Sequence, residues 1–121
     1  MAKKVRLHGV FRTVKVRAAT TANITIATAL NNGDTLDGVT LATDDRVLVK
    51  NQTTGSENGV YVVGTTPARS ADWAAGASVV GFAARIYEGT AGAGKVYAVY
   101  AEPAVVGTDD PQLILHERHG A

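Results

Sequence analysis

Cysteine is absent from this chain of 121 residues, and aromatic residues are scarce. Without cysteine the chain can form neither a disulfide framework nor a thiolate metal site. Aromatic residues make up only 6% of the sequence, with a single tryptophan, so the core must be built mainly from small side chains. Apolar runs are only a few residues long, and no apolar segment follows the first methionine. We therefore expect no membrane span and no secretory signal, but a protein made and folded in a cytoplasm.

The sequence nevertheless has the composition of a folded protein. Hydrophobic residues make up 45% of it, which is too many for a disordered chain. A length of 121 residues suits one domain with a core of its own. We predict a single β domain over residues 14–121, preceded by a basic arm or edge strand at residues 1–13.

Charge is unevenly distributed along the chain, although the formal net charge is only +1. Residues 1–33 contain six basic side chains and no acidic one, whereas residues 34–121 contain six basic and eleven acidic side chains. This asymmetry favours docking onto an acidic neighbour, or head-to-tail contact between copies. Nucleic acid is the weaker candidate, because aromatic residues other than Phe11 do not interleave with the basic segment. The predicted docking residues are Lys3, Lys4, Arg6, Arg12, Lys15 and Arg17.

The strongest local pattern is a β-hairpin within residues 45–63. Its two β-branched runs are DRVLVKNQ at 45–52 and NGVYVV at 58–63. Period-two alternation on both sides of a loop of turn-forming residues is typical of a hairpin. The alternation places Val47 and Val49 on one face of the first strand. We expect Asn58 and Gly59 to bend the chain through positive φ angles.

Other alternating segments predict further short strands separated by turns. These segments lie at 3–8, 14–18, 39–41, 79–87, 95–101 and 112–117. Residues 24–26 fit either a strand or an extended arm, and turn residues cluster at 31–34 and 37–38. In the segment 79–87, Arg85 and Tyr87 share the face opposite the apolar one.

No segment shows a helical period over ten residues, and only residues 72–75 suit a single helical turn, with Asp72 as its N-cap. We predict an all-β fold, a small β-sandwich or barrel of about seven or eight short antiparallel strands.

The titratable residues do not form a recognisable catalytic or metal-binding pattern. The candidates are His8, His116 and His119 for zinc, and Asp34, Asp37 and Asp44 for calcium. The histidines come from opposite ends of the chain, and the aspartates lack the full calcium-loop pattern. The glycines Gly89, Gly92 and Gly94 lack the spacing of a phosphate loop and are interpreted as a hairpin connection. We predict a protein that is not an enzyme and binds no cofactor or metal.

Trp73 has two interpretations. With Arg69 and Asp72 beside it, the indole ring is a candidate glycan contact that stacks on a sugar. A single tryptophan in an alanine-rich domain is more often the largest anchor of the core, and we favour that interpretation.

Four blocks of the sequence stand in a characteristic order: VRAATTANI at 16–24, LDGV at 36–39, DRVLVKNQT at 45–53 and ENGVYVV at 57–63. Together with EGT at 88–90 they resemble a module that is common in tail fibre proteins of tailed phages and prophages. The resemblance runs from about residue 14 to residue 90. It departs from the module at Arg69, Asp72 and Trp73, whose order is altered.

The resemblance implies a structural component of a phage or phage-like virion, assembled in the host cytoplasm. Tail fibre proteins are usually long, so a short chain that begins with its own methionine favours a capsid decoration, a head spike or fibre base, or a small tail component. We expect a homo-oligomer, in particular a trimer, that contacts capsid or tail proteins. The alternative is a module that binds carbohydrate or a host receptor, and a third hypothesis is an enzyme acting on cell-surface polysaccharide.

Overall fold

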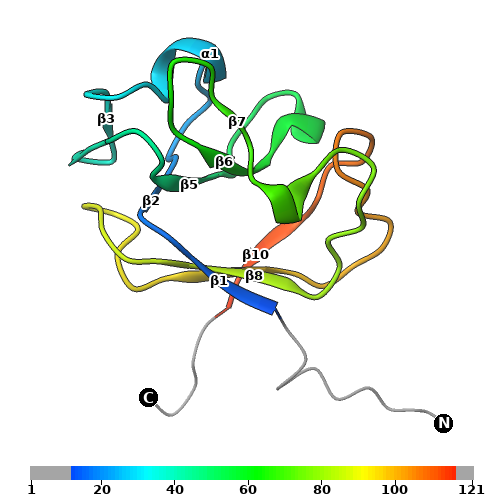
Figure 1. Cartoon of the computed structure of the whole chain (residues 1–121). Helices are drawn as coiled ribbons and strands as arrows, with labels where there is room; N and C mark the ends of the chain where they lie inside the picture. The colour runs from blue at the N-terminus through cyan, green and yellow to red at the C-terminus, as the bar shows by residue number, and fades with distance from the viewer. Residues whose placement is uncertain (1–11, 117–121) are drawn as a thin grey trace, which may run out of the picture.

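The computed structural model describes residues 12–116, whose regular secondary structure consists mainly of short strands joined by turns and loops (Figure 1). The elements are β1 (Arg12–Val16), β2 (Ala18–Ala19), α1 (Ile26–Ala29), β3 (Thr35–Leu36), β4 (Val39–Thr40), β5 (Arg46–Val49), the 3₁₀ helix η1 (Gly55–Glu57), β6 (Gly59–Val62), β7 (Ala68–Arg69), the 3₁₀ helix η2 (Ala71–Trp73), β8 (Phe82–Ile86), β9 (Val96–Val99) and β10 (Leu113–Leu115). The all-β prediction is confirmed, with strands that are shorter and more numerous than expected. The strand predicted at 3–8 lies outside the described residues.

The strands form two four-stranded sheets and one hairpin. Sheet A has the order β1-β8-β9-β10, sheet B has the order β2-β5-β6-β7, and β3 pairs with β4. Figure 1 shows sheets A and B as two layers, with α1 beyond sheet B. Within residues 12–116, no helix has the length and apolar character needed to cross a bilayer.

Two strand pairs are parallel, which corrects the prediction of an antiparallel fold. β1 runs parallel to β8, and β2 runs parallel to β5. The predicted strand at 14–18 is divided at Arg17, where the chain leaves sheet A and enters sheet B. One extended segment thus supplies an edge strand to each sheet. Hairpin-connected strands must be antiparallel, but β1 and β2 are far from their partners in sequence and escape that constraint.

The first hydrophobic core contains residues of both sheets. Sheet A contributes Val16 and Phe82, among others, and sheet B contributes Leu48. Trp73 packs edge-to-face on Phe82, with ring centroids 5.1 Å apart, and its side chain is fully buried. The interpretation of Trp73 as the anchor of the core is therefore confirmed.

A second hydrophobic core covers the opposite face of sheet B. Val47 and Val49 point into it together, as predicted, and meet residues from the segment that contains α1, β3 and β4. β5 is therefore buried on both faces, and Val47, Leu48 and Val49 are each 0% exposed. Ile26 begins α1 and packs against this core, so the prediction of a strand or extended arm at 24–26 is wrong for this residue.

The predicted hairpin is present, since β5 and β6 pair antiparallel. Its turn differs from the expectation at Asn58, which keeps a φ of −64° and instead accepts a hydrogen bond from the Gln52 N–H at 3.0 Å. Gly59 does have a positive φ, of 154°. A Cβ at this position would lie 2.7 Å from Arg69 Nη1 and 2.7 Å from Trp73 Cε3, so the backbone needs glycine for close approach as well.

Two turn predictions are confirmed and two element boundaries are corrected. Gly33 closes the turn at 31–34 with a φ of 91°, and Asp37 and Gly38 close the β3–β4 hairpin with φ values of 50° and 82°. The helical turn expected at 72–75 is η2, whose N-cap is Ser70 rather than Asp72. The long strand predicted from residue 79 begins only at Phe82, because the preceding residues form a turn.

Candidate functional site at the junction of the two sheets

Arg17 occupies the point where the chain passes from sheet A to sheet B. Its N–H donates to the carbonyl of Arg46 at 2.7 Å, and its carbonyl accepts the N–H of Glu88 at 2.8 Å. Arg46 begins β5 of sheet B, and Glu88 follows β8 of sheet A. The backbone of one residue therefore bonds to the ends of both sheets.

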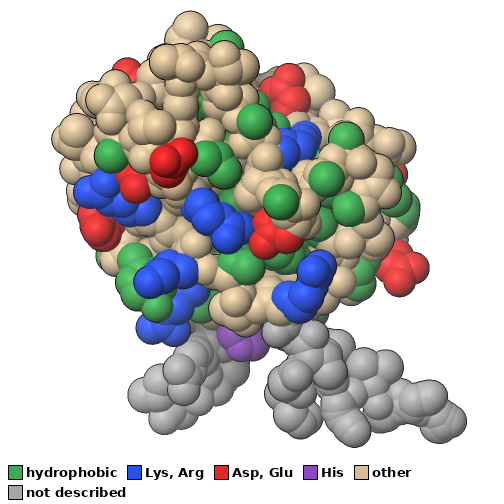
Figure 2. All heavy atoms as spheres, in the orientation of Figure 1, with side chains coloured by type: hydrophobic (Ala, Val, Ile, Leu, Met, Phe, Trp, Pro, Cys, Tyr) green, Lys and Arg blue, Asp and Glu red, His purple; other side chains and the backbone are tan. Residues whose placement is uncertain are grey.

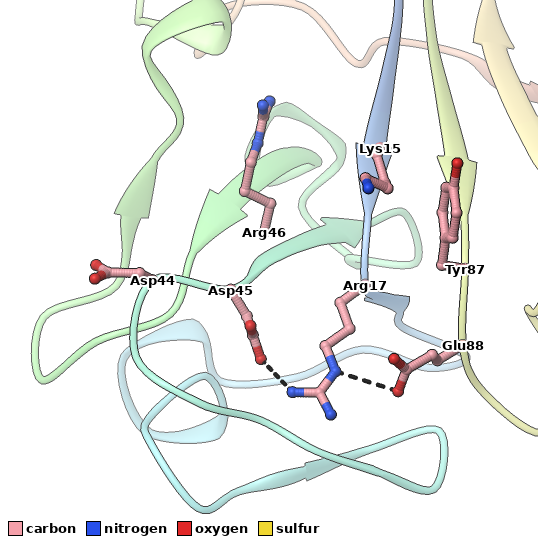
Figure 3. A pocket seen from close by; sticks show the side chains of 7 residues that line it. All are labelled: Lys15, Arg17, Asp44, Asp45, Arg46, Tyr87 and Glu88. Carbon is pink, nitrogen blue, oxygen red and sulfur yellow. Dashed lines mark hydrogen bonds and ion pairs between the residues drawn. The ribbon is translucent and has the colours of Figure 1, made fainter.

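The Arg17 side chain repeats this connection by ion pairing (Figure 3). Its Nη1 lies 2.7 Å from Asp45 Oδ2, and its Nε lies 3.2 Å from Glu88 Oε1. The hydrogen bond to Asp45, followed by that to Glu88, raises the pKa of Arg17 above its usual value. Asp45 Oδ2 also accepts the N–H of Ala42 at 2.8 Å, which fixes the carboxylate in its loop. We call Arg17, Asp45 and Glu88 the Arg17 clamp.

The Arg17 clamp forms part of a groove of about 330 Å³. Its lining residues are Lys15, Arg17, Asp44, Asp45, Arg46, Tyr87 and Glu88. Figure 3 shows Arg17 between its two acidic partners, while Arg46 points away from them and Lys15 lies beside Tyr87. The Lys15 ammonium is 4.9 Å from the centroid of the Tyr87 ring, a cation–π contact.

A second depression, of about 290 Å³, lies beyond Arg46. Arg46 Nη2 is 3.0 Å from one Asp72 oxygen and 3.1 Å from the other, and Ser70 Oγ donates to Asp72 Oδ1 at 2.6 Å. Burial alone would raise the pKa of Asp72, but the hydrogen bonds from Ser70 and Arg46 outweigh it and lower the pKa. The pair joins β5 to η2.

The main interactions at the groove and the neighbouring depression are ion pairs between carboxylates and arginines. Asp45, Asp72 and Glu88 are each bound to an arginine, and these bonds connect separate elements of the fold. Side chains of opposite sign lie next to one another along the groove, an arrangement that suits contact with charged side chains of another protein.

The structure places the predicted docking residues in three different settings. Outside the described residues lie Lys3, Lys4 and Arg6. Arg12 is exposed at the start of β1, with its guanidinium 5.6 Å from the centroid of the Phe82 ring. Lys15 and Arg17 meet at the groove, but Arg17 is engaged in the clamp. Of these three described residues, Arg12 and Lys15 are thus both exposed and outside an ion pair, and Lys15 is the one of these two that lines the groove.

The candidate glycan residues are used inside the fold. Arg69 donates to the carbonyls of Ser56 at 2.8 Å and Asn58 at 3.1 Å, and Asp72 is bound to Arg46. Trp73 is 0% exposed, so its ring has no open face for a sugar. The stacking hypothesis for Trp73 is wrong for this reason.

The glycine-rich connection between β8 and β9 surrounds a carboxylate of the chain itself. The N–H groups of Ala91 and Gly92 donate to Asp37 at 3.0 Å and 2.9 Å. The Asp37 carboxylate therefore holds this loop in place by hydrogen bonds. Among residues 12–116, no three His, Cys, Asp or Glu side chains are grouped as a metal site requires. His116 Nδ1 is 2.8 Å from the Tyr100 hydroxyl, and the other two histidines lie outside that range.

Sequence reasoning missed the Arg17 clamp, although a signal for it existed. Arg17, Asp45 and Glu88 each lie in a different block of the resemblance to the tail fibre module. Oppositely charged residues in separate blocks of one pattern are candidates for mutual contact. Nothing in the spacing alone paired them, because they are 28 and 71 residues apart.

Comparisons with protein-family models, with curated proteins and with solved structures find no match. The resemblance to the tail fibre module therefore stays a prediction.

Proposed function

We propose that this chain is a non-catalytic structural component of a phage or phage-like virion. It serves as a capsid decoration, a head spike or fibre base, or a tail fibre-related protein, and it acts by binding copies of itself and docking on the particle. One observation carries the proposal beyond the resemblance: the blocks of sequence that resemble the tail fibre module are bound to one another across the fold.

The first block is bonded to the third through Thr20, which is fully buried. Thr20 Oγ1 donates to Asn51 Oδ1 at 2.8 Å and accepts the N–H of Lys50 at 2.9 Å. A buried hydroxyl that both donates and accepts a hydrogen bond is satisfied, and these two bonds hold the end of β5 against the segment after β2.

Gln52 connects three of the blocks. Its side chain accepts the N–H of Ile24 at 2.9 Å and donates to the carbonyl of the same residue at 2.9 Å. Its amide nitrogen also donates to Glu57 Oε1 at 2.9 Å. In the fourth block, the Tyr61 hydroxyl donates to the Glu57 carbonyl at 2.6 Å. The Gln52 side chain thus bonds both backbone groups of Ile24, as a neighbouring β-strand would.

The second block is bonded to the segment 88–90. The N–H of Thr90 donates to the carbonyl of Asp37 at 2.9 Å, and Gly89 lies so close to Asp37 that an added Cβ would clash with its carboxylate. Glu88, in the same segment, belongs to the Arg17 clamp. The pattern therefore specifies how segments are held together, which is what a recurrent assembly module needs.

The proposal extends to architecture and assembly. We infer that sheets A and B form a small sandwich around the first core, and that copies associate as a trimer. β10 and β7 lie at sheet edges, and a sheet edge can pair with another chain unless it is covered or blunted.

The test is to locate the chain in particles. Particles induced from the source host would be purified on a density gradient, analysed by mass spectrometry and imaged by electron cryomicroscopy. We expect a fixed number of copies, in multiples of three, at one place on the head or tail, and no enrichment of a non-structural phage protein from the same lysate. Absence of the chain from intact particles, or turnover of a cell-surface polysaccharide by a monomer, would contradict the proposal.

A further inference from the structure

We propose that the outer face of sheet A is a docking surface for a protein that presents carboxylates around an apolar contact. The outer face includes Thr13, Lys15, Ala83, Arg85, Tyr87, Val96, Ala98, Tyr100 and Ile114. This inference rests on the docking role in the proposed function and names the surface and the chemistry of the partner.

Strand geometry defines this face. Phe82, Ala84 and Ile86 of β8 point into the first core, so the residues between and after them point the other way. The pairing register continues this alternation across the sheet, with Ala83 beside Ala98 and Ala98 beside Ile114. No described strand covers the outer face, since sheet B and both cores lie on the inner side.

The outer face carries the exposed apolar surface of the described residues. Their large hydrophobic side chains with high exposure are three: Tyr87 at 52%, Tyr100 at 38% and Ile114 at 48%. The small side chains of Ala83 and Ala98 lie in the row that ends at Ile114 and are nearly buried. The pairing register places Tyr87 and Tyr100 at opposite ends of this face, with Ile114 between them on the edge strand, so the apolar contacts are spread over the face.

Positive charge accompanies this apolar surface. Lys15 and Arg85 are direct neighbours in the β1–β8 register, and both lie over Tyr87, at 4.9 Å and 5.7 Å from the ring centroid. Like charges in direct cross-strand register repel each other. Within residues 12–116 neither side chain makes an ion pair. Figure 2 shows Lys and Arg side chains in the lower part of the molecule, at the level of sheet A in Figure 1.

A hollow between these cations has the size of a side chain. It is open to solvent, has a volume of about 110 Å³ and is lined by Thr13, Val14, Lys15, Arg85 and Tyr87. A carboxylate placed there would neutralise both cations and relieve their repulsion. Charge complementarity therefore points to an acidic partner.

The same contacts favour a protein over a nucleic acid. Nucleic-acid platforms use open aromatic rings for stacking, but the Tyr87 ring is already in contact with two cations. Ile114 offers an apolar contact that phosphate cannot use. Residues 1–11 are poor occupants of the face, because they contain Lys3, Lys4 and Arg6 and no acid.

The experiment uses the full chain and a fluorescein-labelled synthetic peptide of alternating glutamate and leucine, with binding measured by anisotropy. Lys15→Glu tests the face, and Lys95→Glu is the matched control, because both lysines are exposed and Lys95 lies outside the face. We expect Lys15→Glu to weaken binding by about tenfold or more and Lys95→Glu by less than about twofold. Ile114→Ser should weaken binding by about threefold to tenfold with little dependence on salt.

Several results would overturn the inference. They are absence of peptide binding by the wild-type chain, equal losses in the two lysine variants, tighter binding of oligodeoxythymidylate than of the peptide, and dissociation of a homo-oligomer by Lys15→Glu. Circular dichroism of each variant verifies that the loss is not unfolding.

Particle binding separates this inference from the proposed function. If the chain occurs on particles and Lys15→Glu attaches as well as the wild type, the inference fails and the proposed function stands. If the peptide results hold but the chain is absent from particles, the proposed function fails instead.

Discussion

Sheets A and B have four strands each but differ in how they are covered. Sheet B is covered on both faces, and its strand β5 has three consecutive residues at 0% exposure. Sheet A contributes one face to the shared core and presents Tyr87, Tyr100 and Ile114 on the other.

From this difference we infer that sheet B mainly stabilises the fold, whereas the outer face of sheet A is available to bind a partner. The hydrogen bonds among the blocks that resemble the tail fibre module are concentrated at sheet B and its junction with sheet A. The outer face of sheet A has charged and aromatic side chains that pack on one another at the surface, as Lys15 and Arg85 do on Tyr87. Substitutions in the two regions should therefore affect different properties.

The largest effect on stability is expected for Trp73→Ala. The indole is fully buried in the first core and packs on Phe82, so its removal leaves a large cavity. We expect a loss of about 3–5 kcal/mol in the free energy of unfolding, measured by urea denaturation. Ile114→Ala, on the outer face, is the comparison and should cost about 1 kcal/mol or less. Equal losses would remove the distinction between the two regions.

Gly59→Ala should have the next largest effect. The added Cβ would meet Trp73 and Arg69 at 2.7 Å, at a φ of 154° that alanine rarely adopts. The expected cost is on the order of 1–3 kcal/mol. Gly64→Ala is the matched control, because nothing lies within 4 Å of its added Cβ, and it should leave stability unchanged or raise it by about 0.4–1 kcal/mol. A Gly59→Ala variant with the stability of the wild type would contradict the close packing described at the start of β6.

We expect the two ion pairs of the Arg17 clamp to contribute unequally to stability. Double-mutant cycles of Arg17→Gln with Asp45→Asn and with Glu88→Gln measure each coupling free energy. The Asp45 coupling should be the larger, because its contact is 2.7 Å against 3.2 Å and its side chain is 21% exposed against 53%. The order should persist in high salt, with the Glu88 coupling reduced more. A larger Glu88 coupling would disagree with this geometry.

The smallest expected effect is the contribution of the Asp72 carboxylate to stability, which can be measured through its pH dependence. Because the pKa of Asp72 is lowered in the folded state, its contribution is present above the unfolded value of about 3.9 and is lost as pH falls through the folded value. The stability difference between wild type and Asp72→Asn should be constant above about pH 5 and shrink below about pH 4. A difference that grows with falling pH would show that the sign of the shift is wrong.

Local chemistry made the β5–β6 hairpin and several turns predictable. The β5–β6 hairpin, the turn at Gly33 and the turn at Asp37 and Gly38 follow from residues adjacent in sequence. The outward direction of Arg85 and Tyr87 follows from simple alternation. These features need no knowledge of distant segments.

Distant contacts explain what was missed. No local sequence pattern indicates that Arg17 divides one extended segment between two sheets, because its partners are 28 and 71 residues away. The alternation in β5 predicted that Val47 and Val49 share a face, but not that α1, β3 and β4 fold over that face. The buried state of Trp73 was favoured from composition, but its neighbours were not predictable.

Hydrogen–deuterium exchange of the full chain, with and without the glutamate–leucine peptide, tests the central claim most directly. The free protein should exchange slowest in β5 and β6, and the peptide should slow exchange in β1, β8, β9 and β10 while leaving β5 and β6 unchanged. Slower exchange confined to sheet B, or no change in any strand, would contradict the assignment of sheet B to support and sheet A to contact.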